Sequence, residues 1–163
     1  MIRVVKDSPV LIADDVKLYR EMLRRWVIEA EMTPLVADDG VEALRLFGDH
    51  QPPIVITDIE MAGGDGYELI QGVRAADWRS NRHTRVIVMS SLRDSDIGPI
   101  SANQGADAFI EKPIVKSALM RLLDLSRPLK DWTDLSDRSR VEENESIRTV
   151  SPVLRRIVGS AAT

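Results

Sequence analysis

The sequence predicts an α/β domain with a doubly wound, five-stranded parallel sheet flanked by five helices, followed by a short C-terminal tail. Two observations predict this class. Five short apolar runs occur in order along the chain, and stretches with helical spacing of apolar residues follow them. Apolar runs with little alternation are typical of parallel strands that are buried on both faces. Alternating strands and helices then cover both faces of one sheet through right-handed crossovers.

The predicted strands are short runs that are mostly rich in branched residues. They lie at residues 10–13, 35–37, 54–57, 86–89 and 108–110. In a doubly wound sheet, ligands bind at the carboxyl ends of the strands. We therefore expect a functional site among the residues that directly follow these runs.

Apolar residues at three- and four-residue spacing predict amphipathic helices after the strands. The first stripe consists of Leu18, Met22, Leu23, Trp26, Val27 and Ala30. A shorter one consists of Val41, Leu44 and Phe47, and the last of Val115, Ala118, Leu119, Leu122 and Leu123. We expect each stripe to pack against the sheet.

The length of 163 residues corresponds to one domain, since domains usually have roughly 100–200 residues. We expect this domain to span residues 8–126 and the tail to span residues 127–163. Polar composition from residue 131 to 149 predicts a linker. Ser151-Pro152, followed by apolar residues, predicts a short helix near residues 152–158.

Composition excludes several classes of protein. Lysine and arginine total 22 and aspartate and glutamate total 26, so the net charge of −4 argues against a duplex nucleic-acid partner. The absence of cysteine excludes disulfides, thiolate nucleophiles and cysteine-ligated metals. No apolar run approaches the ~18 residues of a membrane span, and the first residues lack the apolar segment of a secretory signal. We therefore expect a cytoplasmic protein without a membrane partner.

Chemically active residues follow four of the predicted strands. Asp14 and Asp15 follow the first strand, Asp58 the third, Ser90 the fourth and Lys112 the fifth. Three neighbouring carboxylates repel one another unless a cation lies among them, and Mg²⁺ prefers such oxygen ligands. One carboxylate then remains to accept a phosphoryl group as an aspartyl phosphate. The ammonium and hydroxyl groups would contact the phosphoryl oxygens.

Each of these residues alone has an ordinary structural explanation. Asp14-Asp15 would more often cap a helix, and Asp58 could be a turn residue at a strand end. Lys112 alone would be a solvated charge. Their combination at one edge of the predicted sheet favours the functional interpretation.

The sequence resembles the receiver domain of response regulators, the CheY-like domain of two-component signalling. The resemblance rests on four segments in family order: VLIADD at 10–15, ITDIEMAGGDG at 56–66, VMSS at 88–91 and GADAFIEKP at 105–113. It covers residues 8–126 and implies the flavodoxin-like fold of that family.

The resemblance implies roles for the acidic residues. Asp58 matches the phosphoacceptor, which takes its phosphoryl group from a phosphohistidine or a small phosphodonor. Asp15 matches the direct Mg²⁺ ligand, and Asp14 assists through water. The main-chain carbonyl of Glu60, together with Asp58, completes the metal site.

The resemblance also implies a switch. Lys112 matches the residue that pairs with the phosphoryl oxygens, and the peptide bond before Pro113 is usually cis in the family. Ser90 matches the hydroxyl that moves to the phosphoryl group on activation. Phe109 matches the aromatic residue that then turns inward. Output is expected on the surface of the fourth helix, fifth strand and fifth helix.

The expected function is that of a response regulator, which accepts a phosphoryl group from a sensor histidine kinase and switches a surface for an unknown downstream protein. It is not an enzyme beyond its own phosphorylation and dephosphorylation. A homodimer formed on phosphorylation is a further expectation, and the tail is a candidate for docking on the output face or for self-association. Two alternatives remain: a phosphorelay intermediate that passes the group to a histidine transfer domain, and a metal-dependent phosphohydrolase.

Overall fold

A computed structural model of the chain describes residues 6–91, 96–129 and 147–149. In chain order its elements are β1 (Pro9–Ala13), α1 (Lys17–Glu29), β2 (Thr33–Ala37), α2 (Gly40–His50), β3 (Ile54–Asp58), α3 (Gly66–Ser80), β4 (Arg85–Ser90), α4 (Ile97–Gln104), β5 (Ala108–Glu111), α5 (Lys116–Leu123) and β6 (Ile147–Thr149). The strands form one sheet in the order β2-β1-β3-β4-β5-β6. The pairs from β2 to β5 are all parallel, which confirms the predicted five-stranded parallel sheet with five helices.

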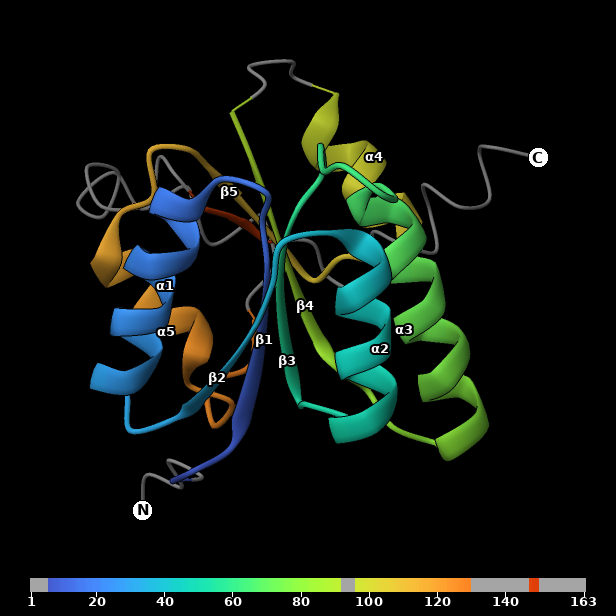
Figure 1. Cartoon of the computed structure of the whole chain (residues 1–163), viewed down its shortest axis with the longest axis horizontal. Helices are drawn as coiled ribbons and strands as arrows, with labels where there is room; N and C mark the ends of the chain where they lie inside the picture. Colours follow the sequence, from blue (N-terminus) through green and yellow to red (C-terminus); the bar gives the residue numbers. More distant parts are fainter. Residues whose placement is uncertain (1–5, 92–95, 130–146, 150–163) are drawn as a thin grey trace.

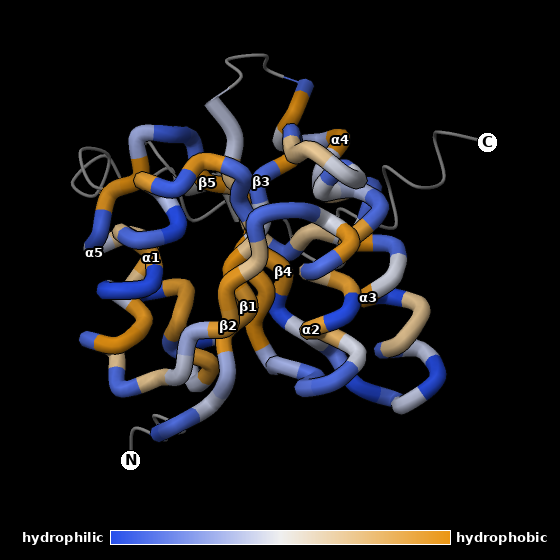
Figure 2. The backbone as a smooth tube through the Cα atoms, in the orientation of Figure 1, coloured by the Kyte–Doolittle hydropathy of each residue, from blue (hydrophilic) through white to orange (hydrophobic). Residues whose placement is uncertain are grey.

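Helices cover both faces of the sheet. Helices α1 and α5 lie on one face, and α2, α3 and α4 lie on the other (Figure 1). Successive residues of β1 point to opposite faces of the sheet. Val10 and Ile12 belong to the core cluster of α1 and α5, whereas Leu11 and Ala13 belong to that of α2 and α3. Figure 2 shows the strands as the apolar centre of the molecule. Within the described residues, no helix is long and apolar enough to cross a bilayer.

The strand register aligns the ends of the strands that carry the candidate site. Ala13 lies opposite Thr57, Asp58 lies opposite Met89, and Ser90 lies opposite Glu111. Because the strands are parallel, the residues that end or follow β1, β3, β4 and β5 emerge at the same edge of the sheet.

The expectation for the tail is wrong at residues 147–149, which were assigned to a linker. These residues form β6, which pairs antiparallel with β5. An edge strand exposes main-chain N–H and C=O groups, and pairing with a tail segment satisfies them whatever the polarity of that segment. Local composition therefore does not signal the strand. The helix expected near residues 152–158 and the linker residues 131–146 lie outside the described residues.

Four apolar residues of the predicted helix stripes are exposed to solvent: Leu18, Val41, Leu44 and Val115. Leu18 is 73% exposed, Val41 is 69% exposed and Val115 is 45% exposed. Leu18 and Val41 lie in the first turn of α1 and α2, and Val115 directly precedes α5. Leu44, one turn further along α2, is 38% exposed. Helical spacing identifies the side of a helix that faces the core, but not how far along the helix the core extends.

Candidate functional site

Three carboxylates converge at the carboxyl edge of the sheet. Asp14 and Asp15 follow β1, and Asp58 ends β3; each offers an oxygen, and these oxygens all lie within 4.8 Å of one another. Asp14 is fully buried and Asp58 is 7% exposed, whereas Asp15 is exposed to solvent. The structure thus brings together the three acidic residues that the sequence placed at strand ends.

Lys112 supplies the positive charge of the cluster. Its Nζ donates to Asp14 Oδ2 at 2.8 Å and to Asp58 Oδ2 at 3.2 Å. The Lys112 side chain is only 5% exposed, and its ammonium lies 4.0 Å from the centre of the Tyr19 ring. Tyr19 has no signal in the sequence motifs; its place in the first turn of α1 brings the ring over the site, where it adds a cation–π contact.

Main-chain groups hold the two buried carboxylates in place. The N–H of Val16 donates to Asp14 Oδ1 at 2.8 Å, and the N–H of Ile59 donates to Asp58 Oδ1 at 2.8 Å. Asp58 therefore turns one oxygen toward the main chain and the other toward Lys112.

Burial and charge act in opposite directions on the ionisation of this cluster. Burial raises the pKa of Asp58 above its ordinary value, and the Asp14 charge adds to the rise; Lys112 and the Ile59 N–H lower it without cancelling it. Burial lowers the pKa of Lys112, but its hydrogen bond to Asp14 and the two carboxylate charges outweigh burial and raise that pKa. Lys112 therefore remains an ammonium ion at neutral pH.

The donor set fits a hard divalent cation. Three carboxylates face one ammonium, so the ionised cluster carries an excess of negative charge. Carboxylate oxygens with one exposed member, Asp15, suit Mg²⁺, which binds through one or two carboxylates and keeps several waters. Glu60 is exposed beyond the end of β3, and its main-chain role remains a prediction.

The two candidate switch residues lie on neighbouring strands. Ser90 ends β4 and is 1% exposed, and its main-chain oxygen accepts from the N–H of Lys112 at 2.9 Å. Phe109, in the middle of β5, is 2% exposed and packs in the core cluster under α2 and α3. The peptide bond between Lys112 and Pro113 is cis, as the resemblance implies.

The glycine-rich turn after β3 permits a close approach to Asp58. A Cβ atom on Gly66 would lie 2.2 Å from the main-chain oxygen of Asp58, closer than any side chain allows. Gly63 and Gly64 have positive φ angles of 71° and 116°. The sequence identified this segment only as a turn, because a contact between two main chains leaves no sequence signal other than the glycine itself.

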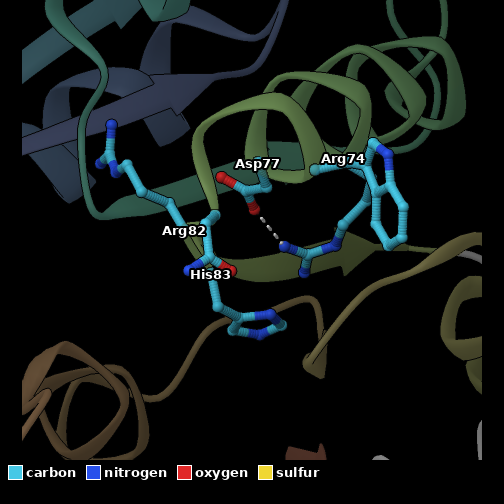
Figure 3. A pocket seen from close by; sticks show the side chains of 6 residues that line it. Arg74, Asp77, Arg82 and His83 are labelled. Atoms are coloured by element: carbon cyan, nitrogen blue, oxygen red, sulfur yellow. Dashed lines mark hydrogen bonds and ion pairs between the residues drawn. The ribbon is translucent and has the colours of Figure 1, made fainter.

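A separate pocket lies at the other end of the sheet, where α3 ends and β4 begins. Figure 3 shows its lining, which consists of Arg74, Asp77, Trp78, Asn81, Arg82 and His83. Arg74 pairs with Asp77 and with Asp107, each at 2.8 Å, and Arg82 donates to Gln51. These charges are engaged in holding α3 to its neighbours.

A doubly wound sheet with three acidic residues and a lysine at one edge is the arrangement of a receiver-type signalling domain. Residues 10–124 match the response regulator receiver domain family. The chain belongs to this family, whose members are signalling domains, and its Asp14, Asp15 and Asp58 form the acidic pocket consistent with signalling through an aspartyl phosphate.

Comparison with individual proteins agrees with this assignment. The chain is 32% identical over 119 residues to an uncharacterized response regulatory protein of Staphylococcus epidermidis. The matched segment covers 71% of this chain and 45% of that protein. The chain thus spans about half the length of the curated relatives that it matches. The receiver domain of a Francisella response regulator has a TM-score of 0.63 and 26% identity, covering 74% of this chain and 100% of that chain. CheY in a CheX–CheY–BeF3–Mg²⁺ complex from Borrelia burgdorferi has a TM-score of 0.65 and 26% identity, covering 72% of this chain and 87% of that chain.

Proposed function

We propose that this chain is a response regulator that accepts a phosphoryl group on Asp58 from a sensor histidine kinase and thereby switches a surface for a downstream protein. The observation that carries the proposal is the position of Asp58 Oδ2, which lies beside the Lys112 ammonium and within the acidic cluster. A buried carboxylate with a cation at one oxygen is placed to attack phosphorus and to have the new charge neutralised.

The transfer exchanges one bond to phosphorus for another. An oxygen of Asp58 attacks the phosphorus of a phosphohistidine; the O–P bond forms as the P–N bond breaks, and the histidine nitrogen leaves with the electron pair. Lys112 then exchanges its contact with Asp58 for a contact with a phosphoryl oxygen, while Asp14 continues to hold its ammonium. Positioning and charge neutralisation supply most of the catalysis in such transfers.

The metal site is proposed to use Asp14, Asp15, Asp58 and the main-chain carbonyl of Glu60, with Mg²⁺ as the cation. The chemistry that Mg²⁺ supplies when bound is neutralisation of charge on the phosphoryl oxygens. Asp15, which is exposed, offers an oxygen to a cation that arrives from solvent, and Asp14 and Asp58 form the buried wall.

The switch is proposed to run through Ser90 and Phe109. The phosphoryl group adds about −1.5 to −2 charge and three acceptor oxygens, so it favours arrangements that bring the Ser90 hydroxyl toward it. In this proposal, phosphorylation also favours the inward position of Phe109, whose ring is buried in the core. The output surface comprises α4, β5 and α5 of a domain that spans residues 8–126, with residues 127–163 as the tail.

The cellular setting is part of the same proposal. A sensor histidine kinase supplies the phosphoryl group in the cytoplasm, and a downstream protein or a second copy of the chain reads the output surface. The chemistry is limited to phosphorylation and dephosphorylation of the chain itself, without turnover of an external substrate.

The test is incubation of the chain with acetyl phosphate or phosphoramidate and Mg²⁺, followed by intact mass measurement. We expect one phosphoryl group on the wild type, none on Asp58→Ala, and one on Asp38→Ala. Asp38 is the matched control, because it is an exposed carboxylate that follows β2 at the same sheet edge but lies outside the cluster. Equal phosphorylation of wild type and Asp58→Ala would contradict the proposal, and repeated turnover of a phosphomonoester would favour a phosphohydrolase instead.

A further inference from the structure

We propose that the outer edge of β5 is a docking surface for an extended peptide strand, that residues 147–149 of the same chain occupy it, and that this pairing favours phosphorylation of Asp58. The inference rests on the proposed function, and it adds to it a regulatory contact made by the tail. It assigns a role to a segment that lies beyond the family match at residues 10–124.

The docking is a main-chain contact along most of β5. Thr149 lies opposite Ala108, Arg148 opposite Phe109 and Ile147 opposite Ile110, in antiparallel register. The short segment lies beside β5 in Figure 1. Without it, β5 would be the edge of the sheet and would expose the N–H and C=O groups that face away from β4. Addition of an extended segment to such an edge is a common mode of peptide recognition.

The strand that receives the tail also carries two residues of the proposed switch. Phe109 lies in the middle of β5, and Lys112 directly follows its last residue, Glu111. The main-chain N–H of Lys112 bonds to Ser90 at the end of β4, and its ammonium bonds to Asp14 and Asp58. The position of β5 therefore sets the position of the ammonium and of the phenyl ring, and β6 helps to fix that position from the side opposite β4.

We infer that β6 pairing favours phosphorylation, rather than opposing it, from the arrangement of the site when β6 is paired. With β6 in place, Phe109 is buried and Lys112 reaches both buried carboxylates. A four-residue strand held on one side only opens more readily than one held on both sides. Loss of β6 lowers the fraction of molecules in the competent arrangement, and the apparent reactivity falls by the same fraction.

Linkage requires the effect to be reciprocal. If β6 pairing favours the arrangement that takes the phosphoryl group, then phosphorylation must favour β6 pairing by the same factor. The prediction therefore has two independent readouts, one at the acidic edge and one at the tail. If the tail paired with β5 without coupling to the site, neither the phosphorylation rate nor the protection of the tail amides would change.

A pair of proline variants in the full chain tests the first readout. In an antiparallel ladder, the N–H and C=O of one residue point to the same neighbour, and those of the next residue point away. One of Ile147→Pro and Arg148→Pro therefore removes a hydrogen bond to β5, and the other places proline on the outer side, where an edge strand tolerates it. We expect one variant to slow phosphorylation by acetyl phosphate and Mg²⁺ about fivefold or more, and the other to match the wild type.

Hydrogen exchange tests the second readout. Adding acetyl phosphate and Mg²⁺ to the wild type should slow amide exchange in residues 147–149, and the same addition to Asp58→Ala should not. Circular dichroism and the unfolding midpoint of each proline variant show whether the domain itself remains folded.

The outcomes separate the tail inference from the proposed function. If Asp58 is phosphorylated at the same rate in both proline variants, or faster in either, the coupling is overturned and the proposed function stands. If the wild type takes no phosphoryl group, the proposed function falls and the coupling falls with it. Protection of residues 147–149 that depends on protein concentration would assign the docked strand to a second copy and overturn its assignment to the same chain.

Discussion

Lys112 holds two buried carboxylates together through a single ammonium group. Asp14 and Asp58 have side chains that are 0% and 10% exposed, so neither charge is well hydrated. Removing one member of a buried ion pair leaves an uncompensated charge in a poorly solvated place. We therefore expect the stability of the domain and the reactivity of the proposed site to depend on Lys112.

Lys112→Met should lower the free energy of unfolding by about 3–5 kcal/mol at neutral pH without metal, because Asp14 and Asp58 lose their counter-ion. Added Mg²⁺ should recover part of this loss. Urea unfolding with and without Mg²⁺ measures both effects. Lys116→Met is the control, since Lys116 pairs with Glu29 at an exposed site and should change the stability by at most about 1 kcal/mol. Equal effects of the two substitutions would contradict the structure of the site.

Asp58→Asn should make the metal-free protein more stable than the wild type at neutral pH. The folded pKa of Asp58 is raised, mainly by burial, so the wild type loses stability as the pH rises through that pKa. The advantage of the variant should disappear on acidification, when Asp58 of the wild type takes up a proton. Thermal unfolding in a chelator across a pH series should show a midpoint a few degrees higher for the variant at neutral pH only. A variant less stable than the wild type at neutral pH would contradict a desolvated carboxylate.

Gly66→Ala should destabilise the domain by about 1–3 kcal/mol, because the added methyl group would force the turn away from Asp58. The required displacement follows from the distance of 2.2 Å between an added Cβ and the Asp58 oxygen. Gly48→Ala is the matched control: Gly48 lies within α2 with nothing within 4 Å of an added Cβ. That substitution should stabilise the domain by about 0.5–1 kcal/mol. Chemical unfolding of both variants gives the comparison, and a tolerated Gly66→Ala would show that the turn is not closely packed.

Arg74 of α3 joins several elements at the edge of the sheet opposite the acidic cluster, where β4 and β5 begin. Its guanidinium donates to the main-chain oxygen of Gly105 at 2.9 and 2.7 Å and to the main-chain oxygen of Thr84 at 2.7 Å. It also pairs with the buried carboxylates of Asp77 and Asp107. One side chain thus connects α3 to the start of β4 and to the turn before β5.

Arg74→Met should lower the free energy of unfolding by about 3 kcal/mol, because it leaves two buried carboxylates without their cation. Arg79→Met, on the exposed side of the same helix, should change it by less than about 0.5 kcal/mol. Guanidinium unfolding of the two variants provides the measurement. A loss of phosphorylation in Arg74→Met without a loss of stability would contradict a purely structural role.

The sequence predicted the strands and helices that have a local pattern of apolar residues. It missed the features that depend on contact with another segment of the main chain. The apolar runs that became β1 to β5 are visible because both faces of each strand are buried, and the acidic residues at their ends could be placed by topology alone. The β6 strand was missed because its partner is the main chain of β5, and the packing of Gly66 against Asp58 was missed for the same reason. Leu18 and Val41 were placed in the core because helical spacing does not show where the sheet ends.

In the molecule as a whole, the two edges of the sheet carry different kinds of residues. The carboxyl edge collects repelling carboxylates, exposed apolar residues and a glycine-rich turn, whereas the opposite edge holds the arginine–aspartate network of Arg74. The parallel strands connect the two edges, and the tail strand β6 pairs with β5 from outside the family match.

The most direct test of the central claim is to locate the phosphoryl group on the chain. After incubation with acetyl phosphate and Mg²⁺, reduction with borohydride converts an acyl phosphate of aspartate into a homoserine side chain, and tandem mass spectrometry of the peptides identifies its position. We expect conversion at position 58 alone. Conversion at position 14 or 15, or a phosphoryl group retained on a histidine, would contradict it.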